Sequence, residues 1–574
     1  MVAYHQREMR REWWAYFARL EMESEQLFED QDCIAGLIHD GRAPEKVARS
    51  FLYTCIYDPV QEVKAQVNDA FSMKHDPGVT ATITELDREL GLIRFKTTAK
   101  DLPATLDLVP KKPRGYDFEK VVREYAEAYV NGHIHQALDD FLERRPPRLN
   151  DSTHLPQSEA ETSVEKVVKV ICAMEGSSLV IQGPPGAGKT YVGAQAISEL
   201  CKHGKRVGIM SNSHKAIDNL LIEAIQFCHA ESKGKRVIKI GQSVSIEAVE
   251  LVESGSQLTN FDSVMLVGGT VWAFAKTHFK DQFDFLFIDE ASQVSLANLV
   301  AASGAARNFV FLGDQMQLAQ PAKGSHPGDS GLSCLDYYLM NLPTIPANQG
   351  IFLPVTRRLH PDICEAISDG IYEGRLTHHP STENRVLLPK GTEIHVRMPS
   401  GICYVPIIHE GNRQSSEEEA IAVREIVAEL LQMKVCEGAV QRPLIRDDIL
   451  IVAPYNLQVR NLQRVLGDNL RIGSVDKFQG QEAAVVILSL GASTASDAPR
   501  GIDFIFDLHR MNVALSRAKS LAIVVSNAGL ASCYVSDPNQ MRLVNFYCRV
   551  VAKILPGNHS LDETDASIAP IQKS

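Results

Sequence analysis

The stretch IQGPPGAGKT, residues 181–190, constrains the fold more than any other part of the chain. It fits the pattern G-x-x-x-x-G-K-[ST], which begins here at Gly183 and ends at Thr190. A short apolar run precedes it, and apolar side chains from Val192 onward recur at helical spacing. A strand, a glycine-rich turn and a helix N-terminus together direct backbone N–H groups toward an anion. We therefore expect a phosphate-binding loop in which Lys189 contacts the β- and γ-phosphates and Thr190 ligates Mg²⁺.

Length and composition indicate a multidomain globular protein. The chain has 574 residues, of which 44% are hydrophobic and 23% are charged, and no apolar run is long enough for a membrane span. The eleven cysteines include no C-x-x-C pair, which argues against structural zinc or a disulfide framework and favours the cytoplasm. Because the net charge is −12, any nucleic-acid partner must be bound by basic residues gathered in one place.

Periodicity divides the chain into helical, β and α/β parts. The segment VTATITELDRELGLIRFKTT alternates apolar and polar residues around a turn, which predicts a hairpin and, with its surroundings, a small β-barrel. Later, short apolar runs alternate with helical patterns in two successive blocks, which is typical of parallel sheets covered by helices. The expected parts are a helical region at 1–57, the barrel at 58–112, a helix and linker at 113–150, two α/β units at 151–345 and 346–555, and a disordered tail at 556–574.

Acidic and amide side chains follow two of the predicted strands in the first α/β unit. The stretch FDFLFIDEASQ places Asp289 and Glu290 at the carboxyl end of a buried strand, where open α/β sheets carry ligand-binding groups. We expect Asp289 to hold Mg²⁺ and Glu290 to orient and deprotonate an attacking water. In FLGDQMQLAQP, Gln317 follows the next strand and is expected near the γ-phosphate.

Two arginines in the second α/β unit complete the expected site. Arg358 lies in TRRLHP and Arg517 in NVALSRAK. A planar guanidinium suits the charge that develops on a transferring γ-phosphoryl group. With two α/β units in tandem, these residues predict a nucleotide clamped between two domains, so that hydrolysis is coupled to domain motion.

The ordered motifs resemble those of helicase superfamily 1. They are QGPPGAGKT, SNSHKAIDNLL, DEASQ, GDQMQL, RRLHP, APYNLQ, SVDKFQGQE and NVALSRAK. DEASQ with VDKFQGQE resembles the B branch, which includes the RNA helicase of nonsense-mediated decay and the eukaryotic replication nuclease-helicase. The resemblance implies two tandem RecA-like P-loop domains, preceded by a helical stalk and a small β-barrel accessory domain. It also implies ATP and Mg²⁺ as cofactors and 5′→3′ movement.

The N-terminal part narrows the resemblance. YHQREMRREWWAYFARLEM, RRPPRL and KGSHP resemble bacterial proteins in which a RecB-like nuclease is fused to such a helicase. The chain is similar to the helicase half of those proteins, which implies a separately encoded nuclease subunit as a partner. The aromatic residues near the start, Trp13, Trp14 and Phe17 among them, are either core or an interface for that partner.

The resemblance carries further roles to individual positions. Nucleotide contacts fall on Gly183, Pro184, Pro185, Gly186, Ala187, Gly188, Lys189, Thr190 and Glu482. Strand contacts, mainly to phosphate and sugar, fall on Ser211, Asn212, Thr270, Pro454, Tyr455, Ser474 and Asp476. The sequence departs from the family twice, because Arg357 replaces an aromatic residue that packs on adenine and because Gln157 is too far from the loop to be the usual adenine-reading glutamine.

The function expected from these observations is an ATP-dependent 5′→3′ helicase or translocase on single strands, with DNA favoured over RNA. Two alternatives stay open at this stage. One is an RNA helicase, and the other is a nucleotide-gated subunit that binds nucleic acid or protein and unwinds little.

Overall fold

A computed structural model describes residues 1–39, 41–113, 118–228, 234–241, 248–320, 322–467, 469–478 and 480–552. The predicted tail at 556–574 lies outside the described residues. The chain forms two compact units, one of Met1–His133 with Pro321–Gly331 and one of Ile134–Gln320 with Leu332–Ser574. None of the helices in the described ranges combines the length and apolar character that crossing a membrane requires.

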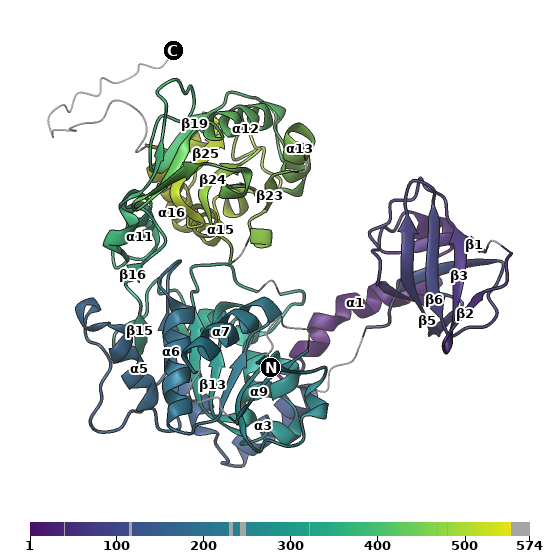
Figure 1. Ribbon diagram of the computed structural model, residues 1–574, viewed down its shortest axis with the longest axis horizontal. Coiled ribbons are helices and arrows are strands. Elements are labelled where there is room, and N and C mark those ends of the chain that lie inside the picture. The colour runs from purple at the N-terminus through teal and green to yellow at the C-terminus, as the bar shows by residue number, and fades with distance from the viewer. Residues whose placement is uncertain are drawn as a thin grey trace. The chain divides into compact units, whose positions relative to one another are not determined.

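The first unit contains a closed antiparallel barrel of six strands (Figure 1). Closure comes from β1, which pairs with β7 on one side and with β3 on the other. Alternate residues point inward and form an apolar core, in which Ile93 and Phe95 are fully buried. A short strand, β2 (Glu45–Val47), extends the sheet beyond β3. The barrel strands in spatial order are β1 (Ile34–His39), β7 (Thr105–Pro110), β4 (Ala70–Met73), β5 (Asp76–Asp87), β6 (Leu92–Thr97) and β3 (Ser50–Ile56).

The N-terminal region differs from the helical expectation for residues 1–57. Helices α1 (Tyr4–Glu21) and α2 (Ser24–Phe28) form as expected, but residues 34–56 supply three strands. Short apolar runs such as those in 34–39 and 50–56 fit a helix or a strand equally well in isolation. Pairing with distant strands decides between them, because β1 bonds to β7 nearly seventy residues later in the chain. The barrel therefore begins well before residue 58, and the other predicted boundaries stay predictions.

Helix α1 packs within the first unit against two other segments. Its His5 ring contacts the Phe118 ring at the start of α3 (Phe118–Val130), with centroids 4.9 Å apart. Its Glu8 carboxylate accepts hydrogen bonds from the backbone N–H groups of Lys323 and Gly324. The role of these helices as a stalk stays a proposal.

The second unit contains two parallel sheets, as the alternation of runs predicted. The first sheet has eight strands, and β14 shows how its two faces are covered. Val310 and Leu312 pack into the core formed with α5 (Val164–Cys172), α6 (Lys189–Lys202) and α7 (His214–Phe227). Phe311 points to the opposite face and stacks on Phe141 of α4 (Gln136–Leu142) at 4.3 Å. The strands in spatial order are β11 (Glu250–Val252), β10 (Arg236–Ile240), β12 (Val264–Gly269), β9 (Val207–Met210), β13 (Phe283–Ile288), β14 (Ala306–Gly313), β8 (Ser178–Gln182) and β15 (Gly350–Phe352).

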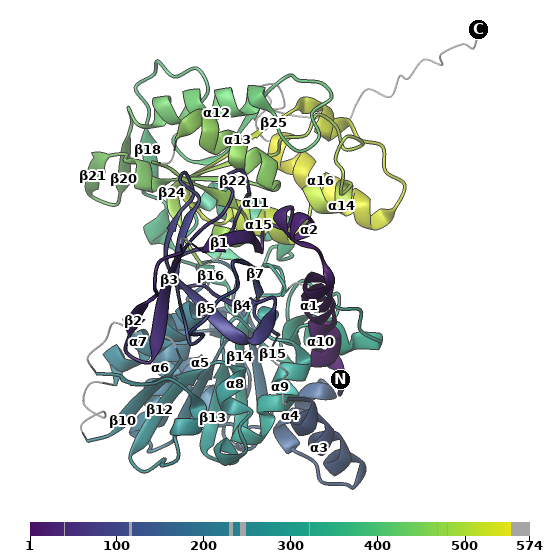
Figure 2. The same ribbon diagram turned by 90° about the vertical axis from the view of Figure 1, so that its right-hand side faces the viewer.

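The second sheet has five parallel strands between two layers of helices (Figure 2). One face packs against α12 (Glu417–Leu430) and α13 (Asn456–Leu466). The other packs against α11 (Pro361–Ile371), α15 (Leu508–Leu515) and α16 (Pro538–Ala552). The strands in spatial order are β19 (Gly401–Pro406), β25 (Ala518–Ser526), β24 (Ala483–Ser489), β22 (Ile449–Ala453) and β23 (Arg471–Ser474).

Candidate nucleotide site and strand face

The predicted phosphate loop connects β8 to α6, the context that its sequence requires. Gly188 caps α6 in the left-handed conformation, with φ 82°. At Gly183 an added Cβ would meet Lys189 Cγ at 2.3 Å, and at Gly186 it would meet Arg358 Cβ at 2.4 Å. These positions therefore require glycine, whose missing side chain lets the loop backbone lie directly against Lys189 and Arg358. The Lys189 ammonium group donates to the Gly183 carbonyl and thus lies inside the loop.

Asp289 and Glu290 follow β13 directly, as predicted. Asp289 is buried, and Glu290 has φ 51°, a left-handed conformation that non-glycine residues rarely adopt. Burial, with a further contribution from the charge of Glu290, raises the pKa of Asp289 to about 7, against the opposing effects of the Glu290 N–H and the Lys189 charge. A bound cation would stabilise the ionised carboxylate of such a residue. The hydroxyl of Thr190, half-buried at the start of α6, and the carboxylate of Asp289 are oxygen ligands of the kind that Mg²⁺ prefers, and their role as its ligands stays a prediction.

Arg358 lies against the phosphate loop because its neighbours bond to the loop backbone. The Thr356 hydroxyl donates to the Pro185 carbonyl at 2.8 Å, and the Arg357 N–H donates to the Gly186 carbonyl at 2.9 Å. The Arg358 Nε then donates to one oxygen of Glu482 at 2.7 Å, and this residue immediately precedes β24 of the second sheet. Lys519 binds the other oxygen, also at 2.7 Å. Burial alone would raise the pKa of Glu482, but the two cations lower it, so Glu482 stays ionised between them.

Arg517 is buried at the same junction between the two sheets. Its Nη2 donates to Gln317 Oε1 at 3.4 Å and its Nη1 to the Gln481 carbonyl at 3.3 Å, while its buried Nε has no hydrogen-bond partner among the described residues. Burial lowers the pKa of Arg517 to about 10, and the charge of Arg358 contributes to the shift. The long bonds and the unpartnered Nε of Arg517, beside the positive charge of Arg358, favour an anion at this place. The structure thus brings Arg517 together with Gln317 and Arg358, and their roles toward a nucleotide stay predictions.

A cavity of about 940 Å³ lies beside the phosphate loop, between α5 and α6. Arg357 lines it, as do Tyr191 and Gln195, which the sequence analysis did not identify. The sequence could have indicated them, because a spacing of four residues on α6 brings both side chains to one helix face directly after the loop. Gln157 is not in the cavity wall, and its amide donates to the Leu155 carbonyl at 3.0 Å instead.

The predicted strand-contact residues all lie at or just beyond the carboxyl ends of parallel strands. They come from both sheets and follow β9, β12, β22 and β23. Asp476, with Glu290 and Gln293, lines a smaller cavity of about 250 Å³. Ser211 and Tyr455 are buried, and the Tyr455 hydroxyl has no hydrogen-bond partner among the described residues. The structure therefore places these residues along one edge of each sheet, but not all of their side chains are open to a ligand.

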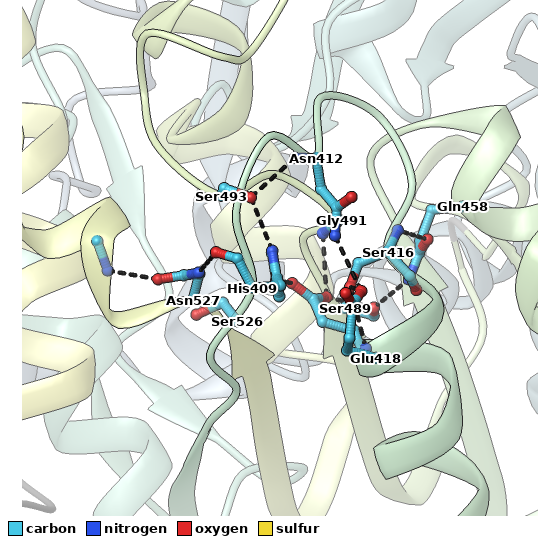
Figure 3. A network of polar contacts seen from close by, with 12 residues as sticks. His409, Asn412, Ser416, Glu418, Gln458, Ser489, Gly491, Ser493, Ser526 and Asn527 are labelled. Carbon is cyan, nitrogen blue, oxygen red and sulfur yellow. Dashed lines mark hydrogen bonds and ion pairs between the residues drawn. The ribbon is translucent and has the colours of Figure 1, made fainter.

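A buried polar cluster supports the same edge of the second sheet (Figure 3). Its centre is the pair His409 and Glu419, whose side chains are fully buried and 3.0 Å apart. Glu419 also accepts from the Ser489 hydroxyl at 2.7 Å and from the Gly491 N–H at 3.0 Å. We call this cluster the edge network. Its remaining members are Ser416, Gln458, Ser493 and Asn527, which tie the starts of α12 and α13 to the ends of β24 and β25.

Comparison with known proteins supports the two-sheet arrangement. A family model described as an AAA domain matches residues 162–329, and a second model with the same description matches residues 338–529. The DNA replication ATP-dependent helicase/nuclease dna2 of Schizosaccharomyces pombe is 24% identical over 435 residues, which cover 69% of this chain and 30% of that protein. The regulator of nonsense transcripts 1 homolog of Drosophila melanogaster is 24% identical over 464 residues, or 71% of this chain and 37% of that protein.

A third relative is the mouse DNA-binding protein SMUBP-2. It is 26% identical over 423 residues, which cover 61% of this chain and 41% of that protein. The chain thus spans well under half the length of these curated relatives. The matched part includes the two parallel sheets, with the phosphate loop and both arginines.

Proposed function

We propose, because the chain belongs to the superfamily 1 helicases, that it is an ATP-dependent helicase or translocase acting on single-stranded nucleic acid. The observation that carries the proposal is the convergence of charged residues from two parallel sheets at one junction. The phosphate loop and the acidic pair follow strands of the first sheet, Arg358 lies between β16 (Val355–Thr356) and α11, and Arg517 immediately precedes β25 of the second sheet. Hydrolysis at such a junction depends on how the two sheets are aligned, which couples it to movement.

In the proposed reaction, the loop 183–190 holds the phosphates of ATP, while Thr190 and Asp289 hold Mg²⁺. The ion, when bound, neutralises charge on the phosphate oxygens. Glu290 orients the attacking water and accepts its proton. Arg358 and Arg517 then stabilise the negative charge on the transferring phosphoryl group. Glu482 holds Arg358 in place through the hydrogen bond between them.

The cavity beside the loop is the proposed binding site for the base. Arg357 lines it where the family has an aromatic residue, and a guanidinium plane can stack on a base as an aromatic ring does. Tyr191 supplies an aromatic ring from α6. Gln195, one turn further along the same helix, supplies an amide that can hydrogen-bond to the edge of the base. These three residues would take the place of the missing adenine-reading glutamine.

We further propose that the strand is DNA and that movement along it is 5′→3′. Two of the three relatives described above are named for DNA and one for nonsense transcripts. The proposed contacts at the carboxyl ends of the strands are mainly to phosphate and sugar, so binding should tolerate any sequence. With a net charge of −12, such binding must rest on local basic residues and should weaken with salt.

The proposed protein partner is a separately encoded nuclease. Helix α1 carries an aromatic face on which Trp14 is 63% and Phe17 is 52% exposed, and Arg10 stacks on Trp14 at 4.6 Å. Large aromatic residues flanked by basic ones are typical of protein interfaces. Co-purification of the chain from its native host would support the partner if a nuclease is recovered and lost again on Trp14→Ala.

ATPase activity measured without nucleic acid, with single-stranded DNA and with single-stranded RNA tests the main proposal. DNA should stimulate turnover more than RNA. Lys189→Ala should abolish turnover, and Glu290→Gln should bind ATP without hydrolysing it. Lys202→Ala, at the other end of α6 and paired with Glu199, is the matched control and should behave as wild type. Equal ATPase rates in all four proteins would contradict the site, and unwinding only of duplexes with 3′ overhangs would contradict the direction.

A further inference from the structure

We propose that Tyr372 and Asn512 are positioning residues that hold Asp314, and through it Gln317, in the orientation that meets Arg517. They would make the orientation of Gln317 depend on the alignment of the two sheets. The inference rests on the proposed function, because it assigns these residues to ATP turnover. Neither residue touches the phosphate loop or the acidic pair in any described hydrogen bond, so they act through Gln317.

Asp314 is the centre of this arrangement and follows β14 of the first sheet. It is buried, and a single carboxylate oxygen, Oδ2, accepts two hydrogen bonds. One comes from the Gln317 amide at 2.8 Å and the other from the Tyr372 hydroxyl at 2.6 Å. Its second oxygen accepts from the Met316 N–H at 3.2 Å. Gln317 and Tyr372 are therefore joined through one oxygen atom.

Tyr372 comes from the other side of the junction. It follows α11, which packs on the second sheet, and its side chain is fully buried. Its hydroxyl donates to Asp314 and accepts from Asn512 Nδ2 at 2.7 Å. Burial, together with the charge of Asp314, raises the pKa of Tyr372 well above its ordinary value, so the hydroxyl keeps its proton and remains a donor.

Asn512 lies on α15 and, like Tyr372, bonds to the loop that follows β14 of the first sheet. The same Nδ2 donates to the Met316 carbonyl at 2.8 Å, in the loop that carries Gln317. The donors Tyr372 and Asn512 thus belong to elements on the second sheet, and the acceptors Asp314 and Met316 follow the first sheet. We call these four residues with Gln317 and Arg517 the junction network.

The junction network can form only when the two sheets are aligned as they are here. Buried hydrogen bonds to a carboxylate are costly to leave unmade, because no water replaces the lost donor. Gln317 is held on one side by Asp314, while its Oε1 accepts from Arg517 on the other. A shift between the sheets would separate Tyr372 from Asp314 and release Gln317 from its orientation. Turnover would then slow until the alignment is restored.

Tyr372→Phe is the direct test, because it removes only the hydroxyl. Tyr338→Phe is the matched control, since Tyr338 is also buried. Its hydroxyl also donates one hydrogen bond, to the Gln349 carbonyl at 2.9 Å, and both residues lie next to the first sheet. Both variants should lose thermal stability, and Tyr372→Phe somewhat more, because its lost bond is to a charged group. Only Tyr372→Phe should lower kcat, by about 10- to 100-fold for a lost bond to a charged group, with KM for ATP unchanged. Equal kcat values in the two variants would overturn the inference.

A double-mutant cycle separates positioning from a general structural role. In a Gln317→Ala background, Tyr372→Phe should cause no further fall in kcat, because the residue through which it acts is gone. Additive losses would show that Tyr372 does not act through Gln317. If wild type lacks ATPase activity, the proposed function fails. The inference is then judged by amide hydrogen exchange of residues 314–318, which should rise in Tyr372→Phe but not in Tyr338→Phe if it is correct.

Discussion

The second sheet carries a buried polar network at each end, and the two differ in what they connect. The edge network, around His409 and Glu419, joins the carboxyl ends of β24 and β25 to helices of the same domain. The junction network lies at the amino ends of those strands, where Arg517 immediately precedes β25. Three of its hydrogen bonds cross from elements of the second sheet to loops of the first: Tyr372 to Asp314, Asn512 to the Met316 carbonyl, and Arg517 to Gln317.

This difference indicates that two buried hydrogen-bond networks of similar composition have different roles, one in stability and one in turnover. A network inside one domain stays made whenever the domain is folded, so its free energy contributes to stability. A network between domains is made in one alignment and broken in another, so its free energy can be coupled to turnover. Changes at the junction should therefore alter kinetics more than stability, and changes at the edge network should do the reverse.

The largest expected effect is on catalysis at the junction. Arg517→Ala should reduce kcat by about 10³-fold or more, because a guanidinium that stabilises the transferring phosphoryl group contributes that much. The affinity for ATP and the melting temperature should change little, since both hydrogen bonds of Arg517 are long. Steady-state kinetics and a thermal melt measure the two quantities. Arg464→Ala, an exposed arginine on α13 that pairs with Glu417, is the control, and loss of ATP affinity without loss of kcat in Arg517→Ala would contradict the role.

A smaller effect, on stability alone, is expected at the edge network. Glu419→Gln should lower the free energy of unfolding by about 3 kcal/mol. The substitution removes the buried carboxylate that contacts His409, and donors such as the Gly491 N–H then face a weaker acceptor. Chemical denaturation measures the loss, and kcat without nucleic acid should match wild type. Glu418→Gln, on the neighbouring exposed residue, should cost far less. A fall in kcat for Glu419→Gln would erase the distinction between the two networks.

The smallest effect is expected in the cavity that we assign to the base. Tyr191→Ala should raise KM for ATP about tenfold, the amount that a lost stacking contact with a base explains, and should leave kcat near that of wild type. Only affinity should change, because Tyr191 belongs to neither network. Tyr534→Ala is the control, because Tyr534 is almost fully exposed and lies outside this cavity. An unchanged KM in Tyr191→Ala would place the base elsewhere.

Local sequence was sufficient to predict a structural element wherever the motif and its flanking residues fix the local backbone conformation. The phosphate loop and the acidic pair follow strands β8 and β13, as their flanking residues required. The two parallel sheets could also be expected, because long alternating patterns leave few other folds. Residues 34–56 show the limit of this reasoning, since short apolar runs became strands only by pairing across the barrel.

The motifs alone predict which side chains would bind phosphate, Mg²⁺ and a transferring phosphoryl group, because the chemistry depends on residue type and spacing. The folded structure decided that Tyr372, which lies in none of the quoted motifs, donates to the same oxygen of Asp314 as Gln317. It placed Asn512, the first residue of NVALSRAK, against the Tyr372 hydroxyl and the Met316 carbonyl. It also decided that Tyr191 and Gln195 line the cavity beside the loop. The physical reason is that these contacts join segments far apart in the chain, or faces of different helices, and no local pattern records which distant side chain completes a hydrogen bond.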